Sequence, residues 1–111
     1  MQDCLFCKII AGELPSTKIY EDDYVYAFED IDKQAPVHVV VVPKNHYKNI
    51  TEVKDSSQVG KIFDAINKIV EQLDVKNGFR VVCNTGEDGG QTVEHLHFHL
   101  MAGRKFGWPA G

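Results

Sequence analysis

Histidine and apolar residues alternate along one short segment of the chain. Residues 94–101 read EHLHFHLM. A period of two is typical of a strand, because successive side chains point to opposite faces of a sheet. We therefore predict a strand over residues 94–102 whose apolar face packs on the core. Its other face would carry three imidazoles, those of His95, His97 and His99, each roughly 6.5 Å from the next.

Four further segments combine β-branched or aromatic residues with turn-forming residues at their ends, which is typical of strands. These predicted strands cover residues 18–21, 24–30, 37–43 and 79–84. The pair Asp22-Asp23 separates the first two, and such a pair favours a hairpin turn.

The strongest helical pattern begins at Asp55. Apolar residues with helical spacing follow it at positions 59, 62, 63, 66, 69, 70 and 73, which predicts one buried face. Asp55 and Gln58 resemble a capping pair at its start, and Asn77-Gly78 indicates a turn after its end. A second, short helix is predicted over residues 4–11. The fold class expected is α+β, a mostly antiparallel five-stranded sheet with one long helix and a short N-terminal helix.

Length and charge limit the partners that we expect. The 111 residues predict a single domain, residues 1–111. Acidic residues outnumber basic ones by 16 to 12 and the two kinds are interleaved, which argues against a nucleic-acid partner. The longest apolar run, residues 37–43, is far shorter than the roughly 18 residues of a membrane span, so no membrane partner is expected. The first residues, MQDC, contain no secretion signal, and the expected location is the cytoplasm.

The three cysteines cannot all pair with one another. In a reducing compartment, the spacing Cys4-x-x-Cys7 is typical of metal ligands or of a redox dithiol. Cys83 lies in the apolar run of residues 79–83 and is expected to be a small buried core residue.

The histidine row has three interpretations. It is a solvated polar face, a metal centre of three histidines, or a site of nucleophilic catalysis in which neighbouring groups hold the tautomer of one attacking imidazole. The preceding loop favours the third, because its paired glycines let N–H groups approach an anion and Asn84, Gln91 and Thr92 offer hydrogen bonds. That combination suits phosphoryl or nucleotidyl transfer. A plain hairpin loop explains the glycine pair about as well.

The segment 95–101 resembles the His-φ-His-φ-His-φ-φ motif that names the histidine triad (HIT) family. Residues 89–93, GGQTV, and the C-terminal GR at 103–104 and GWPAG at 107–111 are similar to the Hint branch, the nucleoside phosphoramidases. Similarity extends to residues 28–31, 35–38 and 42–46 and so covers nearly the whole chain.

The resemblance implies a HIT-like fold and a reaction at the α-phosphate of a purine nucleotide conjugate. His97 would be the nucleophile and would form a nucleotidyl-histidine intermediate, which water then hydrolyses. His99 would contact the phosphate oxygens and the leaving-group side. Asn84 and Thr92 would hold the phosphate, with Gly90 and Gln91 contributing from the same loop. No metal is required for the chemical step, since neighbouring donors can stabilise phosphoryl charge.

Further roles follow from the same resemblance. Asp30 would accept hydrogen bonds from the ribose hydroxyls. The base pocket would have apolar walls from Phe6, Ile9, Phe28 and Ile31, although simple core packing explains these four residues equally well. His38 would be an accessory histidine. Trp108 belongs to the tail that marks the Hint branch and bears on the leaving group, and Ala110 stands where close relatives commonly have a second proline.

The resemblance also implies a structural zinc ion, as in bacterial members. Its ligands would be Cys4, Cys7, His46 and His95, which removes His95 from the chemistry. Four protein ligands fill a tetrahedral shell, so this ion would not activate water. The alternative is a pair of thiols without a metal.

The expected ligand is a purine nucleoside monophosphate, AMP or GMP, or its conjugate. The expected assembly is a homodimer that joins two sheets into ten strands. Two other functions stay open: a dinucleoside polyphosphate hydrolase, and a purine nucleotide-binding or scaffold protein with little turnover.

Overall fold

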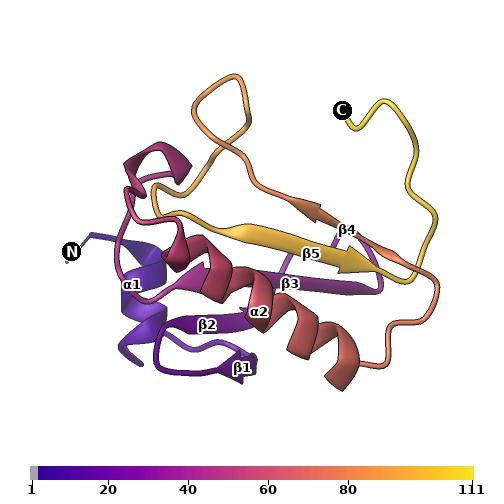
Figure 1. The fold of residues 1–111 in the computed structure, drawn as a ribbon, viewed down its shortest axis with the longest axis horizontal. Helices are drawn as coiled ribbons and strands as arrows, with labels where there is room; N and C mark the ends of the chain where they lie inside the picture. The colour runs from indigo at the N-terminus through magenta and orange to yellow at the C-terminus, as the bar shows by residue number, and fades with distance from the viewer. Residues whose placement is uncertain (1–2) are drawn as a thin grey trace.

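The computed structural model describes residues 3–111. Met1 and Gln2, which were counted above in the 1–111 domain and in the N-terminus without a secretion signal, lie outside them. Five strands form one sheet in the order β1-β2-β3-β5-β4, and every neighbouring pair is antiparallel (Figure 1). The elements are α1 Leu5–Ile10, β1 Lys18–Glu21, β2 Val25–Glu29, β3 Val37–Pro43, the 3₁₀ turn η1 Ile50–Glu52, α2 Ser57–Gln72, β4 Phe79–Val82 and β5 Phe98–Ala102. The predicted α+β class and its five-stranded antiparallel sheet are confirmed.

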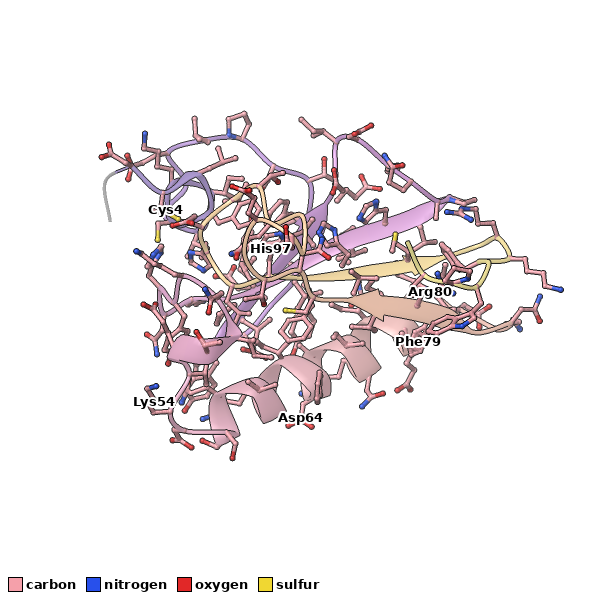
Figure 2. All side chains as sticks on the ribbon, turned by 90° about the horizontal axis from the view of Figure 1, so that it is seen from above. Cys4, Lys54, Asp64, Phe79, Arg80 and His97 are labelled. Carbon is pink, nitrogen blue, oxygen red and sulfur yellow. The ribbon has the colours of Figure 1, made fainter. Side chains whose placement is uncertain are left out.

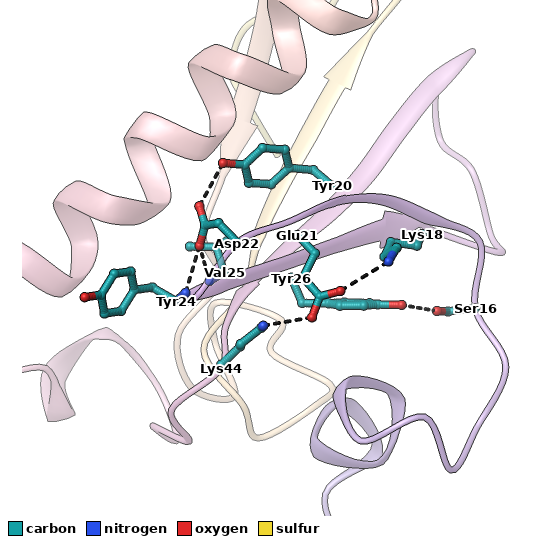
Figure 3. A network of polar contacts seen from close by, with 9 residues as sticks. All are labelled: Ser16, Lys18, Tyr20, Glu21, Asp22, Tyr24, Val25, Tyr26 and Lys44. Atoms are coloured by element: carbon teal, nitrogen blue, oxygen red, sulfur yellow. Dashed lines mark hydrogen bonds and ion pairs between the residues drawn. The ribbon is translucent and has the colours of Figure 1, made fainter.

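The hairpin between β1 and β2 turns at Asp22, as predicted. The carboxylate Oδ1 of Asp22 accepts the backbone N–H groups of Tyr24 and Val25, both at 2.8 Å (Figure 3). The hydroxyl of Tyr20 donates to the other oxygen of Asp22 at 2.8 Å. Beside this turn, Lys44 forms an ion pair of 2.8 Å with Glu21, which ties the end of β3 to β1. An aspartate is favoured here because its short side chain can satisfy backbone donors two and three residues ahead.

Helix α2 packs its apolar stripe on one face of the sheet (Figure 1). Ile62, Ile66 and Ile69 are buried there. Phe63 was predicted in the same buried face, but 49% of it is exposed. It lies at the border of the apolar stripe, where its ring meets that of Phe98 edge-on. The predicted Asp55–Gln58 pair is also wrong in part. Asp55 alone caps the helix, by accepting the N–H of Ser57 on its side chain at 3.0 Å.

The strand that carries the histidines starts later than predicted. Strand β5 begins at Phe98, so His95 and His97 lie in the approach to it. The reason is that the backbone there has other partners: the N–H of His95 donates to Val93 and that of Leu96 donates to the carbonyl of Tyr47 at 2.7 Å. The alternation itself holds on the apolar side, since the even-numbered side chains Leu96, Phe98 and Leu100 are buried in the core. Strand β4 likewise ends at Val82, two residues before the predicted end.

The other face of the sheet is only partly covered. Helix α1 packs there through Phe6 and Ile9, against Tyr26, Phe28, Val40 and Val42 of β2 and β3. Cys83, predicted to be buried, is half-buried and packs at the margin of the core below α2.

Within residues 3–111, no helix combines the length and the apolar character that a bilayer crossing needs. The short α1 leaves much of its sheet face open, and the site lies there.

Candidate functional site

A pocket of about 630 Å³ opens beside α1 on the sheet face opposite α2. Its apolar lining includes all four residues predicted as base-pocket walls: Phe6, Ile9, Phe28 and Ile31. Its polar lining includes Asp30, His38, Asn84, Gly90, Thr92, His97 and His99. The structure therefore brings residues from both ends of the sequence into one concave site. Ile31 stands at the mouth and is fully exposed, whereas Phe6 and Phe28 are buried and touch edge-on at 5.4 Å.

The hydrogen bonds of His97 determine which of its ring nitrogens is free. Its Nδ1 lies 2.7 Å from the backbone carbonyl oxygen of His95. A carbonyl can only accept, so Nδ1 carries the proton and Nε2 keeps a lone pair. Burial lowers the pKa of His97, against the opposing effects of this hydrogen bond and of Asp30, so the ring is neutral near pH 7. An oriented, neutral imidazole with a free Nε2 is the form that can attack an electrophile.

His99 and His38 form a second polar group beside Asp30. Nε2 of His38 lies 2.9 Å from Nδ1 of His99 and 3.4 Å from Oδ2 of Asp30. Nδ1 of His38 accepts the backbone N–H of Gln34 at 3.1 Å. Burial lowers the pKa of His99 to about 4, helped by the neighbouring His97 and His38 and opposed by Asp30. Burial likewise lowers the pKa of His38.

The glycine-rich loop borders the pocket between β4 and β5. Gly89 is required by close packing, since a Cβ there would lie 2.4 Å from the carbonyl oxygen of Thr85, and Gly90 adopts a positive φ of 80°. Loop geometry thus accounts for the glycine pair. Gln91, a predicted nucleotide contact, instead braces the loop: its amide donates to the carbonyls of Lys48 and Val93 at 2.6 and 3.1 Å. Asn84 and Thr92 line the pocket itself.

Two cysteine and two histidine side chains converge beside α1, outside the pocket lining. The ligand atoms of Cys4, Cys7, His46 and His95 all lie within 4.8 Å of one another. Figure 2 shows Cys4 and His97 toward the same end of the sheet, away from Phe79 and Arg80. His95 is fully buried in this cluster, and His97 is only 5% exposed. The histidines therefore do not form a solvated face, and His95 turns away from the other two.

The cluster fits a tetrahedral metal ion. Sγ of Cys4 lies 3.3 Å from Nδ1 of His95, and Sγ of Cys7 lies 3.4 Å from Nδ1 of His46. Zinc with two sulfur and two nitrogen ligands separates its ligand atoms by about 3.3–3.8 Å. Nε2 of His95 donates to the carbonyl of Pro43 at 2.9 Å, which leaves the lone pair on Nδ1 facing the other ligands. Burial, with Cys4 beside it, raises the pKa of the Cys7 thiol to about 11, so a thiolate there at neutral pH needs a cation.

Two predicted residues, Gln91 and Trp108, do not line the pocket, and several residues that do line it were not predicted. Trp108 is 86% exposed and is not part of the pocket lining. The tail before it is held by Arg80, whose guanidinium donates to the carbonyl of Gly107 at 2.8 Å. Two of the unpredicted contributors are the backbone N–H of Gln34 and the apolar side chain of Leu14. No sequence signal identifies them, because one acts through its main chain and the other through the path of a loop.

Solved structures of similar proteins superpose on this chain over most of their length. The histidine triad protein of Clostridium difficile superposes with a TM-score of 0.93 at 49% identity, covering 96% of both chains. A HIT family hydrolase of Legionella pneumophila gives 0.94 at 41% identity, covering 98% of this chain and all of its own. A histidine triad nucleotide-binding protein of Candida albicans gives 0.83 at 35%, covering 98% and 85%.

A curated relative and a family model agree with the structural matches. The 14 kDa zinc-binding protein of Brassica juncea is 40% identical over 114 residues, which cover 98% of this chain and 100% of that protein. The model of the HIT domain matches residues 11–106, which include the pocket loop, β5, and the two pocket-lining histidines His97 and His99. Fold, site and sequence thus lead to one assignment: the chain belongs to the HIT domain family.

Proposed function

We propose that this protein is a nucleotide hydrolase or transferase that acts at the α-phosphate of purine nucleoside phosphoramidates or related nucleotidyl conjugates. The observation that carries the proposal is the 2.7 Å hydrogen bond from Nδ1–H of His97 to the carbonyl of His95, which leaves Nε2 free beside a pocket. The names of two relatives, a HIT family hydrolase and a histidine triad nucleotide-binding protein, point the same way.

The pocket offers one kind of contact to each part of such a ligand. The buried rings of Phe6 and Phe28 supply an apolar wall for a purine base. The carboxylate of Asp30 would accept ribose hydroxyls, since one of its oxygens takes only the N–H of Asp32 at 2.8 Å. Asn84 and Thr92, which line the same pocket as His97, would hold the phosphate from the loop.

The reaction would take two displacements at phosphorus. Nε2 of His97 attacks the α-phosphorus, a nitrogen–phosphorus bond forms, and the bond to the amine breaks as the amine nitrogen takes up a proton from solvent. Water then attacks the same phosphorus and gives up a proton to solvent, the bond to His97 breaks, and the nucleoside monophosphate is released. The imidazole becomes cationic while it is bonded to phosphorus, and the carbonyl of His95 that accepts Nδ1–H stabilises that charge.

We also propose that Cys4, Cys7, His46 and His95 hold a structural Zn²⁺. Their ligand atoms fit a closed tetrahedral shell, and the relative from Brassica juncea is named a zinc-binding protein. When bound, the ion would supply positive charge that keeps the two thiolates deprotonated. It would fix α1 to the approach of β5 and take no part in the displacements.

We propose a homodimer formed through the free edge of β4. This strand is the edge of the sheet. Its residues Phe79 and Val81 are 41 and 39% exposed, and Phe63 of α2 is 49% exposed. An unpaired edge beside apolar side chains favours pairing with a second copy, which would join two sheets into ten strands. A cytoplasmic location, a single domain over residues 1–111, and the lack of nucleic-acid or membrane partners stay predictions.

A turnover assay tests the proposed activity. Purified protein is incubated with an adenosine phosphoramidate, and release of AMP is followed together with hydrolysis of a dinucleoside polyphosphate. The proposal predicts AMP release by the wild type and its loss in His97→Ala, with a circular dichroism spectrum that matches the wild type. Release that is equal in the two proteins would refute the role of His97. If the dinucleotide alone is cleaved, the substrate class is wrong, and binding without any turnover would identify a nucleotide-binding protein.

A further inference from the structure

The proton on His38 can be placed from its partners. Nδ1 of His38 lies 3.1 Å from the backbone nitrogen of Gln34. A backbone N–H can only donate, so this Nδ1 must be the unprotonated nitrogen of the ring. Burial lowers the pKa of His38, although Asp30 and Asp32 face it and oppose the shift, so the ring is neutral near pH 7. A neutral imidazole has one N–H, and in His38 it is therefore on Nε2.

The position of that proton sets the state of the next ring. Nε2–H of His38 lies 2.9 Å from Nδ1 of His99, closer than the 3.4 Å to Oδ2 of Asp30. Nδ1 of His99 must therefore accept. Since burial beside His97 and His38 lowers the pKa of His99 to about 4, this ring is also neutral, and its single proton is on Nε2. In the described residues, Nε2 of His99 has no hydrogen-bond partner within the protein, and His99 lines the pocket.

The same proton argues against a metal ion among Asp30, His38 and His99. Their ligand atoms are within 4.8 Å of one another, close enough for a shared ion. Nε2 of His38 would have to lose its proton to bind one, while the N–H of Gln34 occupies the other lone pair of the ring. The group is better described as a directed chain of hydrogen bonds that runs from the backbone to the pocket.

We propose that His38 is a positioning residue that locks His99 in the Nε2–H tautomer, so that His99 presents a fixed N–H donor to a phosphate oxygen of the ligand. This series of hydrogen bonds begins at the backbone N–H of Gln34. A backbone N–H does not titrate, so the direction of its hydrogen bond to His38 is fixed. The identity of the ligand rests on the function proposed above, whereas the tautomer does not.

Removal of His38 should reverse the tautomer of His99. In His38→Leu, Nδ1 of His99 loses its donor and faces Oδ2 of Asp30, 3.8 Å away. A carboxylate accepts, so the proton would move to Nδ1, and Nε2 would turn a lone pair toward the phosphate. In His38→Gln, the side-chain amide can donate to His99 and its carbonyl can accept from Gln34, so the wild-type tautomer should return.

Nitrogen-15 NMR of the histidine rings at pH 7 measures the tautomer directly, in protein as purified and without ligand. We expect Nε2–H for His99 in the wild type and in His38→Gln, and Nδ1–H in His38→Leu. An Nδ1–H signal for wild-type His99 would overturn the proposal, even if the variants failed to fold. An unchanged tautomer in folded His38→Leu would overturn it as well.

Calorimetric titration with AMP and with adenosine tests the consequence for binding. His38→Leu should bind AMP about tenfold more weakly, the usual effect of losing one hydrogen bond to a charged group, and adenosine unchanged. His38→Gln should recover AMP affinity, and Asp64→Asn, on the exposed face of α2 away from His97 in Figure 2, serves as the matched control. Equal losses for AMP and adenosine would refute the phosphate contact. If the wild type binds neither ligand, the proposed function fails, and the NMR result alone decides the tautomer.

Discussion

The buried His99 should make the protein less stable in mild acid. Burial, with His97 and His38 nearby, lowers the pKa of His99 from 6.5 to about 4 in the folded state. As the pH falls below 6.5, His99 becomes protonated in the unfolded chain but stays neutral in the folded chain. The unfolded state binds more protons throughout this interval, so the free energy of unfolding falls as the pH falls from 6.5 to about 4.

The expected size follows from the shift. One pKa unit corresponds to about 1.4 kcal/mol, so His99 should account for a loss of about 2 kcal/mol at about pH 5 and about 3 kcal/mol at about pH 4. Above the unfolded-state pKa both states are neutral and the loss disappears. With a side chain only 20% exposed, His99 is screened little by solvent.

Urea unfolding of wild type and His99→Gln at about pH 7.5 and about pH 5 isolates this contribution. Groups that do not interact with His99 contribute equally to both proteins and cancel in the difference, whereas the effects of His97 and His38 on His99 are part of the contribution that is measured. The wild type should lose about 2 kcal/mol more than His99→Gln between the two conditions. Asp64→Asn, exposed on α2, should follow the wild type. Equal losses in wild type and His99→Gln would show that His99 titrates normally in the fold and would refute the reasoning.

Three further predictions concern the core, the metal site and the dimer. Leu100→Ala empties a fully buried position in β5 and should lower the free energy of unfolding by about 2–5 kcal/mol in urea titrations, and a loss below about 1 kcal/mol would contradict the assigned core. Cys7→Ser should reduce the zinc content measured by elemental analysis and lower the melting temperature, whereas a wild type purified without chelator that contains no zinc would refute the metal site. Val81→Lys places a charge on the exposed edge strand β4 and should convert a dimer into monomers in sedimentation experiments, while Lys18→Gln, on β1 at the opposite edge of the sheet, should not. A Val81→Lys protein that sediments as the wild type does would exclude this edge as the interface.

The sequence predicted the histidine segment correctly on its apolar side and incorrectly at its start. Leu96, Phe98 and Leu100 are buried, as alternation requires. His95 lies outside the strand because the N–H of Leu96 donates to Tyr47, almost fifty positions earlier in the chain. No local pattern contains that partner. Alternation reports which side chains are buried, and it does not report where a ladder of hydrogen bonds ends.

The long helix shows a similar limit. Its period identified Ile62, Ile66 and Ile69 as buried, because these depend only on spacing within the helix. The exposure of Phe63 depends on how far the sheet extends beneath it, and the sheet ends on that side with the edge strand β4. Spacing within one element cannot supply the width of its partner.

The site was predicted where residue chemistry is specific and missed where it is not. The grouping of Cys4 and Cys7 with distant histidines was expected from the family resemblance, and the structure brings these four side chains together. The tautomer of His38 depends on a backbone N–H at Gln34, which every residue except proline could provide. The sequence therefore cannot predict which backbone N–H meets His38, and the folded structure is needed to identify it.

Helix α1 connects the pocket with the cysteine–histidine cluster. Phe6 lies between Cys4 and Cys7 in sequence, and its ring meets that of His97 edge-on at 5.0 Å. Phe6 thus lies between two residues of the cysteine–histidine cluster in sequence, and its ring touches the proposed nucleophile His97. If a zinc ion in the cluster changes the affinity for a ligand that contacts Phe6, the ligand must change the affinity for zinc by the same factor. The zinc affinity of the protein would then differ between its nucleotide-bound and nucleotide-free forms.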